Sequence, residues 1–273
     1  MFLLEILQYD FMVRAFIVGI FTAICTAILG NFVVTARQAV ISDMLAHTAL
    51  VGVGLGIFWN ISPSLLAFIT TLFSALILWG LNHNKNQAPE AISMLLLTGG
   101  LAAALLLTHL NKNSPISLDT YLFGSILTIT ESEMYTFLGV LILVIALLIF
   151  FWRPFLTLVF DGDFLRTKPY RIFYEILFMV LIALVVSVGL KVIGGLLIGA
   201  LLIIPTLVVQ PFSKSFKQNV IYSIFANLCA LIFGITGSFY FDIPASSGIV
   251  LSLVSLYLIT RLYFYLQKVL KSF

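Results

Sequence analysis

The chain has 273 residues, of which 62% are hydrophobic and 9% are charged, and its mean hydropathy is +1.17. A water-soluble domain of this size could not bury so large an apolar fraction, so the composition indicates an integral membrane protein. The net charge of +3 is small, and the 14 Lys and Arg lie mostly between apolar runs, which indicates membrane topology and argues against nucleic-acid binding.

Apolar runs of helical length recur along the chain and predict membrane-spanning helices, because a bilayer core of about 30 Å takes roughly 20 helical residues. The period-2 alternation of a β-barrel is absent. We therefore predict an all-α fold, a polytopic transmembrane bundle forming a single domain over residues 1–273. The predicted spans are 12–34, 38–59, 64–81, 89–110, 133–152, 172–189, 192–209, 219–240 and 244–265.

The number of spans stays open at eight or nine. Spans six and seven are separated only by Leu190 and Lys191, so their boundary is poorly defined. If one segment is re-entrant, eight spans remain, and hydropathy does not say which segment that would be. The polar connection 111–132 is predicted to be a surface or partly re-entrant segment, and 153–171 is the most highly charged loop.

Basic residues predict the orientation, since they collect on the cytoplasmic side. If alternate loops are cytoplasmic, one side holds 11 of the 14 Lys and Arg residues, which puts the C-terminus inside. The three on the other side are Arg14, Lys112 and Lys191. The first ten residues carry acidic side chains instead of the basic ones that begin a signal peptide, so no cleavable signal peptide is predicted. Cys25 and Cys229 lie in apolar runs and are predicted to be packed core thiols.

The second predicted span carries Asp43 and His47, which would lie near the middle of the bilayer. Ionisable residues there are costly and indicate function. At i and i+4 the two side chains project from one helix face, close enough to share a cation. Oxygen and imidazole nitrogen suit Mn²⁺, Zn²⁺ and Fe²⁺. Two ligands are too few for a stable site, so we expect either a homodimer or further ligands from this chain.

Two other interpretations of Asp43 and His47 stay open. The pair could be a hydrogen-bonded contact between helices, or it could relay protons. His83 and His109 lie near predicted span ends, where solvated polar residues are common. The spacings Gly52–Gly56 and Gly195–Gly199 indicate close helix packing. The chain has no P-loop and no hydrolase motif, so we predict that it is not an enzyme.

Five stretches in order resemble the metal-ion permease family of ABC importers, the membrane subunits of bacterial zinc, manganese and iron uptake systems. RQAVISDMLAHTALVGVGLG is similar to the family's R-x-x-x-x-G-D-x-x-x-H-x-x-L-P-G segment, with Ser42 in place of Gly and Val51 in place of Pro. The missing proline leaves open whether the helix kinks after His47. The other stretches are LDTYLFGSIL, LVFDGDFLR, VIGGLLIGALLIIP and DIPASSGIVL.

The resemblance implies a type II ABC importer-like fold in which Asp43 and His47 contact the transported metal. It further implies a second copy of the chain, a cytoplasmic ATPase, an extracellular or periplasmic metal-binding protein and a location in the bacterial inner membrane. No permanently bound cofactor is expected. The loops 160–171 and 210–218 are predicted to contact the ATPase, through Phe160, Asp161, Phe164, Arg166, Gln210, Pro211, Lys214 and Lys217.

Two rival functions remain at this stage. One is a permease for a metal chelate such as haem or a siderophore complex, which would need a wide pathway lined by neutral groups. The other is an ion-coupled secondary carrier. Which metal is transported is left open, because all three ions accept Asp and His.

Overall fold

The computed structural model describes residues 8–83, 89–110, 118–124, 129–161, 169–195, 197–241 and 243–270. In this part of the chain all regular secondary structure is helical, as predicted. The helices are α2 (Asp10–Thr35), α3 (Ala39–Trp59), α4 (Pro63–His83), α5 (Pro89–Leu110), α6 (Leu118–Leu122), α7 (Glu131–Phe150), α8 (Trp152–Phe160), α10 (Arg171–Val192), α11 (Ile198–Val209), the 3-10 turn η2 (Gln210–Phe212), α12 (Phe216–Phe241) and α13 (Ala245–Leu270).

Among the described residues, 8 helices are long and apolar enough to cross a membrane. They match eight of the predicted spans to within a few residues at most of their ends. The exception is the predicted span 192–209, because α10 continues to Val192 and α11 begins only at Ile198. The boundary predicted at Leu190 and Lys191 was therefore wrong, and the seventh predicted span is shortened to α11, which is not one of the 8 long helices.

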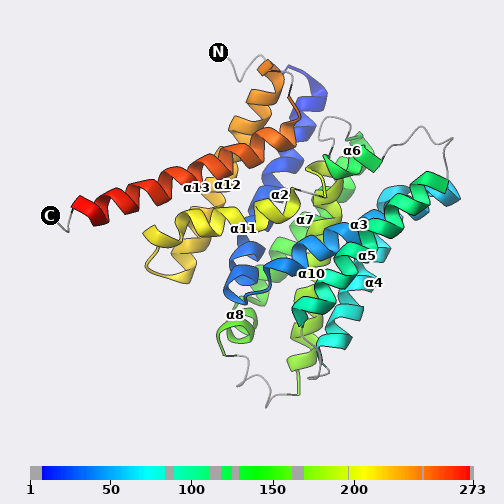
Figure 1. Ribbon diagram of the computed structural model, residues 1–273, viewed down its shortest axis with the longest axis horizontal. Coiled ribbons are helices and arrows are strands. Elements are labelled where there is room, and N and C mark those ends of the chain that lie inside the picture. Colours follow the sequence, from blue (N-terminus) through cyan, green and yellow to red (C-terminus); the bar gives the residue numbers. More distant parts are fainter. Residues whose placement is uncertain are drawn as a thin grey trace.

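The helices run between two ends of the bundle. We call one of them the Arg37 end, after the residue in the connection between α2 and α3. At this end the Phe216 ring at the start of α12 lies 4.9 Å from the Phe32 ring of α2, centroid to centroid. At the second, the Lys191 end, Lys191 of α10 forms an ion pair with Glu133 of α7. Since α10 finishes at the Lys191 end and α12 begins at the Arg37 end, the segment containing α11 carries the chain back between them. Figure 1 shows α11 in the middle of the bundle, beside α2.

At the Lys191 end, the break between α10 and α11 is covered by α6 and the residues after it. The Gly195 N–H donates to the Tyr121 carbonyl at 2.9 Å. Gly194 (φ 106°) and Gly124 (φ 73°) lie so close that a Cβ on either would overlap the other segment's backbone. The predicted surface segment 111–132 thus includes a docked helix, whereas 111–117 and 125–128 lie outside the described residues.

At the Arg37 end, aromatic rings join four helices. Phe155 of α8 is fully buried between Phe32 and Phe178, at centroid distances of 6.2 and 5.5 Å. The Trp152 ring packs edge-on against Phe32 at 5.2 Å. Residues 153–160 were predicted to be a charged loop, and this was wrong: they form α8, because their apolar residues sit on one helical face that completes the core.

A proline inside α11 is compensated by a side chain of α12. Pro205 has no N–H, which leaves the Leu201 carbonyl, four residues earlier, without its helical donor. Asn227 Nδ2 lies 3.2 Å from that oxygen and also 3.1 Å from the Ala23 carbonyl of α2. One amide therefore ties three helices together at the point where the proline interrupts α11.

The remaining predictions about single residues have mixed outcomes. Cys25 is buried, as predicted, but Cys229 lies on the exposed face of α12 and is not a core thiol. His109 is exposed near the end of α5. The His83 side chain lies outside the described residues. α3 continues through Val51 without interruption.

Candidate functional site

Asp43 and His47 lie on the one face of α3 that other helices cover only in part. From Ile41 to Ile57 every residue of α3 is buried except Asp43, His47, Val51 and Leu55, which are partly exposed. The spacing of four residues places these side chains along one stripe of the helix, hereafter the α3 stripe. The other faces are packed against α4, α5, α6, α10 and α11. The stripe is polar in its first half and apolar in its second.

The Asp43 carboxylate lies against the first turn of α11. A Cβ at position 199 would overlap Asp43 Oδ1, so the absence of a side chain at Gly199 makes room for the carboxylate. Gly199 is the second residue of α11, and the positive end of a helix dipole favours a negative charge there. The sequence pattern Gly195–Gly199 predicted close packing, and Gly199 shows what it accommodates.

His47 lies one turn further along the same stripe, with Gly100 of α5 against its backbone. Its Nδ1 atom is buried and has no hydrogen-bond partner among the described residues. Asp43 and His47 interact electrostatically, but no hydrogen bond joins them. A hydrogen-bonded contact between helices was one interpretation of this pair, and the described part of the chain supplies no such bond. Buried polar atoms without partners are rare in proteins and call for an explanation.

No third side chain completes a metal site within the described residues. Groups of three or more His, Cys, Asp or Glu that could hold a metal ion are absent from this part of the chain. Asp43 and His47 can therefore offer one oxygen and one nitrogen ligand type, on an accessible stripe. A pair of this kind needs further ligands to hold a cation, and the His, Cys, Asp and Glu side chains of the described residues do not supply them.

The two loops predicted to contact an ATPase meet at the Arg37 end. The Phe160 ring at the end of α8 lies 5.6 Å from the Phe216 ring at the start of α12. Lys214 and Lys217 are exposed beside it, and Gln210 and Pro211 form η2. Asp161 follows α8 directly, while Phe164 and Arg166 lie outside the described residues.

Two features of the site were not found from the sequence. The contact between Asp43 and Gly199 joins residues 156 positions apart, and only the glycine spacing pointed to close packing there. The aromatic contact between Phe160 and Phe216 has no signal in the local sequence, because phenylalanine is common throughout the chain.

Comparisons with known proteins agree with this architecture. The chain is 28% identical over 255 residues to the high-affinity zinc uptake system membrane protein ZnuB of Haemophilus influenzae, covering 93% of this chain and 97% of the relative. It is 26% identical to the manganese import system permease protein ScaB of Streptococcus gordonii, covering 93% and 91%. The solved structure of PsaBC from Streptococcus pneumoniae in complex with Fab matches with a TM-score of 0.84 at 26% identity, covering 95% and 94% of the two chains.

The sequence profile of the ABC 3 transport family matches residues 8–264, which is nearly the whole chain. The eight long apolar helices make the protein a multi-pass membrane protein, as members of a transport family are expected to be. The chain therefore belongs to the ABC 3 transport family.

Proposed function

We propose that this chain is the permease subunit of an ATP-binding-cassette importer that moves a divalent transition-metal ion, Mn²⁺, Zn²⁺ or Fe²⁺, into the cell. The observation that carries the proposal is the pair Asp43 and His47 on the open stripe of α3, where the buried Nδ1 atom of His47 has no hydrogen-bond partner among the described residues. The names of the relatives ZnuB and ScaB, a zinc uptake protein and a manganese permease, support the same cargo class.

The ion is handled as cargo and passes through by alternating access. Asp43 and His47 are the first ligands it meets in the membrane, and a site of two ligands per chain is weak enough to release it again. A second copy of the chain, related by a two-fold axis along the α3 stripe, would double the ligands to four. The open stripe and the lack of a third His, Cys, Asp or Glu among the described residues support this arrangement.

The energy would come from a separate ATPase on the cytoplasmic side, because this chain has no P-loop. We assign the Arg37 end to the cytoplasm, and with it the C-terminus, since most of the basic residues gather there. The ATPase would bind over Phe160 and η2, where the two predicted contact loops adjoin. A metal-binding protein would deliver the ion at the Lys191 end.

The rival functions are less well supported. Family membership favours an importer over an ion-coupled secondary carrier. A metal-chelate type ABC transporter in an inward-facing conformation matches the fold with a TM-score of 0.70, but at 15% identity that likeness concerns the fold alone. The charged pair on the α3 stripe also suits a bare cation better than a bulky chelate.

The test is uptake of radiolabelled Mn²⁺, Zn²⁺ and Fe²⁺ into cells that express the chain with its partners. Asp43→Asn and His47→Gln keep the side-chain size but remove the ligand chemistry, and each should reduce uptake to the level of cells without the permease. Thr48→Val is the matched control, because its buried hydroxyl bonds only the Leu45 carbonyl of its own helix, at 3.1 Å. Normal uptake by either site variant, at equal amounts of protein in the membrane, would sink the proposal.

A further inference from the structure

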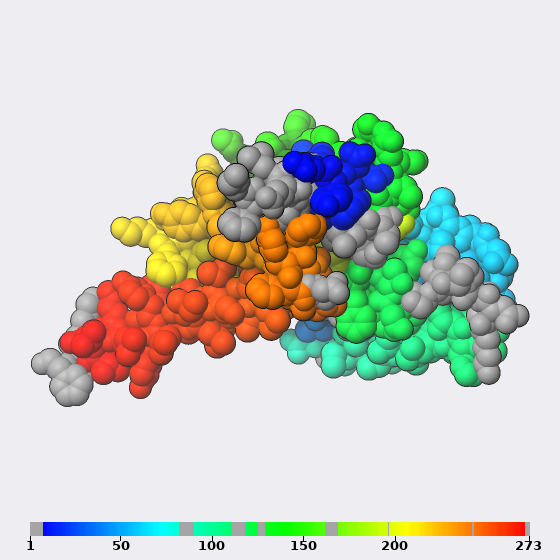
Figure 2. Space-filling model, turned by 90° about the horizontal axis from the view of Figure 1, so that it is seen from above, coloured from blue at the N-terminus to red at the C-terminus, as the bar shows by residue number. Residues whose placement is uncertain are grey.

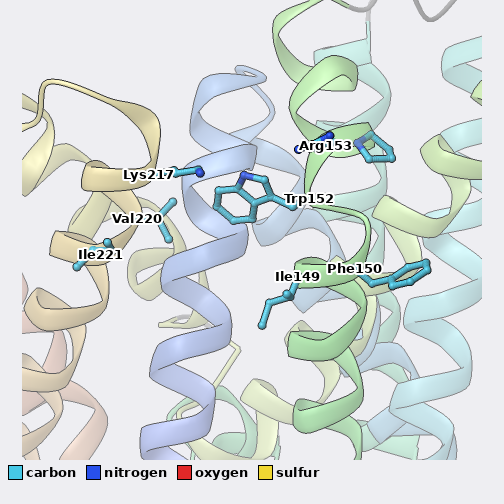
Figure 3. Close-up of a pocket in the computed structure, with 8 residues that line it drawn as sticks. Ile149, Phe150, Trp152, Arg153, Lys217, Val220 and Ile221 are labelled. Atoms are coloured by element: carbon cyan, nitrogen blue, oxygen red, sulfur yellow. The ribbon is translucent and has the colours of Figure 1, made fainter.

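A groove of about 590 Å³ opens at the Arg37 end, away from the α3 stripe. It lies between the end of α7, the start of α8 and the first turns of α12 (Figure 3). Its lining includes Ile149, Trp152, Arg153, Lys217, Val220 and Ile221. None of the residues that line it is acidic.

The apolar part of the groove belongs to membrane-spanning helices. Ile149 of α7 is 66% exposed, and Ile221 of α12 is 52% exposed. Both lie within helices that are long and apolar enough to cross a bilayer. Since exposed aliphatic side chains on such helices meet hydrocarbon, this part of the groove fits an acyl chain.

The polar part of the groove carries two cations. Arg153 lies in the first turn of α8 and Lys217 in the first turn of α12, and both are exposed. Among the described residues neither forms an ion pair with a carboxylate. Figure 3 shows the two side chains on opposite sides of the Trp152 ring. A guanidinium and an ammonium facing one groove without an acidic partner favour an anionic ligand.

The tryptophan between them is also short of a partner. Trp152 Nε1 is buried and has no hydrogen-bond acceptor among the described residues. In Figure 3 the indole nitrogen lies at the upper edge of the ring, at about the same height as the Lys217 nitrogen. Tryptophan is typical of the boundary between the hydrocarbon and the headgroups, where its N–H meets polar groups. The wall of the groove between the two cations therefore contains an N–H group that no described residue satisfies.

We propose that this groove binds one anionic phospholipid of the leaflet at the Arg37 end. Its phosphate lies between Arg153 and Lys217, next to the Trp152 indole, and an acyl chain runs down between Ile149 and Ile221. Basic pockets between membrane helices at the headgroup level are suited to such lipids. The sequence assigned Lys217 to an ATPase contact, but its position in a groove whose other wall is transmembrane favours a lipid over a protein segment.

The test measures lipid retention by the full-length chain purified in detergent, using native mass spectrometry. Phosphatidylglycerol and phosphatidylcholine with the same acyl chains are the probes, because they differ in headgroup charge. The unmodified protein should retain phosphatidylglycerol preferentially. The double variant Arg153→Gln with Lys217→Gln should weaken phosphatidylglycerol binding roughly 25-fold, at roughly fivefold for each cation removed, and leave phosphatidylcholine binding unchanged.

The matched control is Lys214→Gln with Lys268→Gln, which removes the same charge from exposed positions near the same end that do not line the groove. It should keep the preference. Trp152→Phe, which deletes the N–H alone, should weaken binding by a smaller factor. Equal retention by the two double variants, or equal retention of the two lipids by the unmodified protein, overturns the proposal. A second preparation contains the chain together with its ATPase. If Arg153→Gln with Lys217→Gln loses the ATPase there while lipid retention is unchanged, the proposal is also overturned, and the groove is a protein interface.

Discussion

The position of Asp43 depends on the absence of a Cβ atom at Gly199. Gly199 brings the first turn of α11 against the carboxylate, and a Cβ there would occupy the space of Asp43 Oδ1. A carboxylate in contact with backbone has less freedom than one facing a flexible side chain. Its orientation on the α3 stripe is therefore set by α11, a helix that bears neither of the two candidate ligands.

We expect Gly199→Ala to impair transport without removing either candidate ligand. The added methyl group must displace the carboxylate or push α11 away, and overpacking of this kind typically costs about 1–3 kcal/mol. Initial rates of metal uptake should fall about tenfold or more, a loss of about 1.4 kcal/mol or more. The protein should still insert into the membrane.

Gly139→Ala is the control for this substitution, because a Cβ at position 139 of α7 meets nothing within 4 Å. It makes the same chemical change in another spanning helix and should leave uptake unaltered. Unchanged uptake by Gly199→Ala would show that Asp43 is not positioned by α11. At this scale the sequence predicted the two polar residues from their cost in a membrane, but the glycine opposite them could be found only from the three-dimensional contact.

Among the helices, α11 is the one that most depends on its neighbours. It has 12 residues, about 18 Å of helix, which is too short to cross a bilayer core by itself. Pro205 interrupts its hydrogen bonds, and Asn227 supplies the missing donor from α12. The same amide binds Thr26 Oγ1 of α2 at 3.1 Å. A polar contact of this kind is tolerated inside a membrane protein because the alternative is an unpaired carbonyl.

Asn227→Leu should therefore destabilise the protein. It leaves the Leu201 carbonyl without a donor, and polar contacts between membrane helices are worth about 0.6 kcal/mol on average and about 1.7 kcal/mol at most. Because three acceptors share the Asn227 amide as their donor, we expect the free energy of unfolding to fall by an amount near the upper value. The measurement is the free energy of unfolding in mixed micelles. Thr236→Val on the same helix is the control, since Thr236 is exposed and bonds only its own helix.

An unchanged stability of Asn227→Leu would mean that another group satisfies the Leu201 carbonyl. At the scale of elements, the long helices could be predicted because each is an unbroken apolar run. The shorter elements could not. α8 mixes Arg153 with apolar residues in the sequence and is defined by its fit to the aromatic core, and the start of α11 is set by the docking of Tyr121 on the break at Gly195.

At the scale of the whole molecule, the chain passes between the two ends an odd number of times. Tyr9, just before α2, lies at the Lys191 end beside Phe239, at 6.1 Å between ring centroids. Phe264 in the last part of α13 lies 4.9 Å from Phe212 of η2, toward the Arg37 end. Figures 1 and 2 show α13 reaching beyond the other helices. Hydropathy could not decide between eight and nine passes, because the short α11 carries only part of a normal span.

The structure therefore predicts that residues 9 and 268 lie on opposite sides of the membrane. The measurement is labelling of single cysteines with a membrane-impermeant maleimide in intact cells, after Cys25 and Cys229 have been replaced by Ala. Tyr9→Cys should be labelled from outside, whereas Lys268→Cys should react only after the membrane is permeabilised. Lys214→Cys, in the turn just before α12, must behave like Lys268→Cys if α11 carries the chain across. Should Lys214→Cys be labelled in intact cells, α11 would be re-entrant, and the assignment of the Arg37 end to the ATPase would lose its basis.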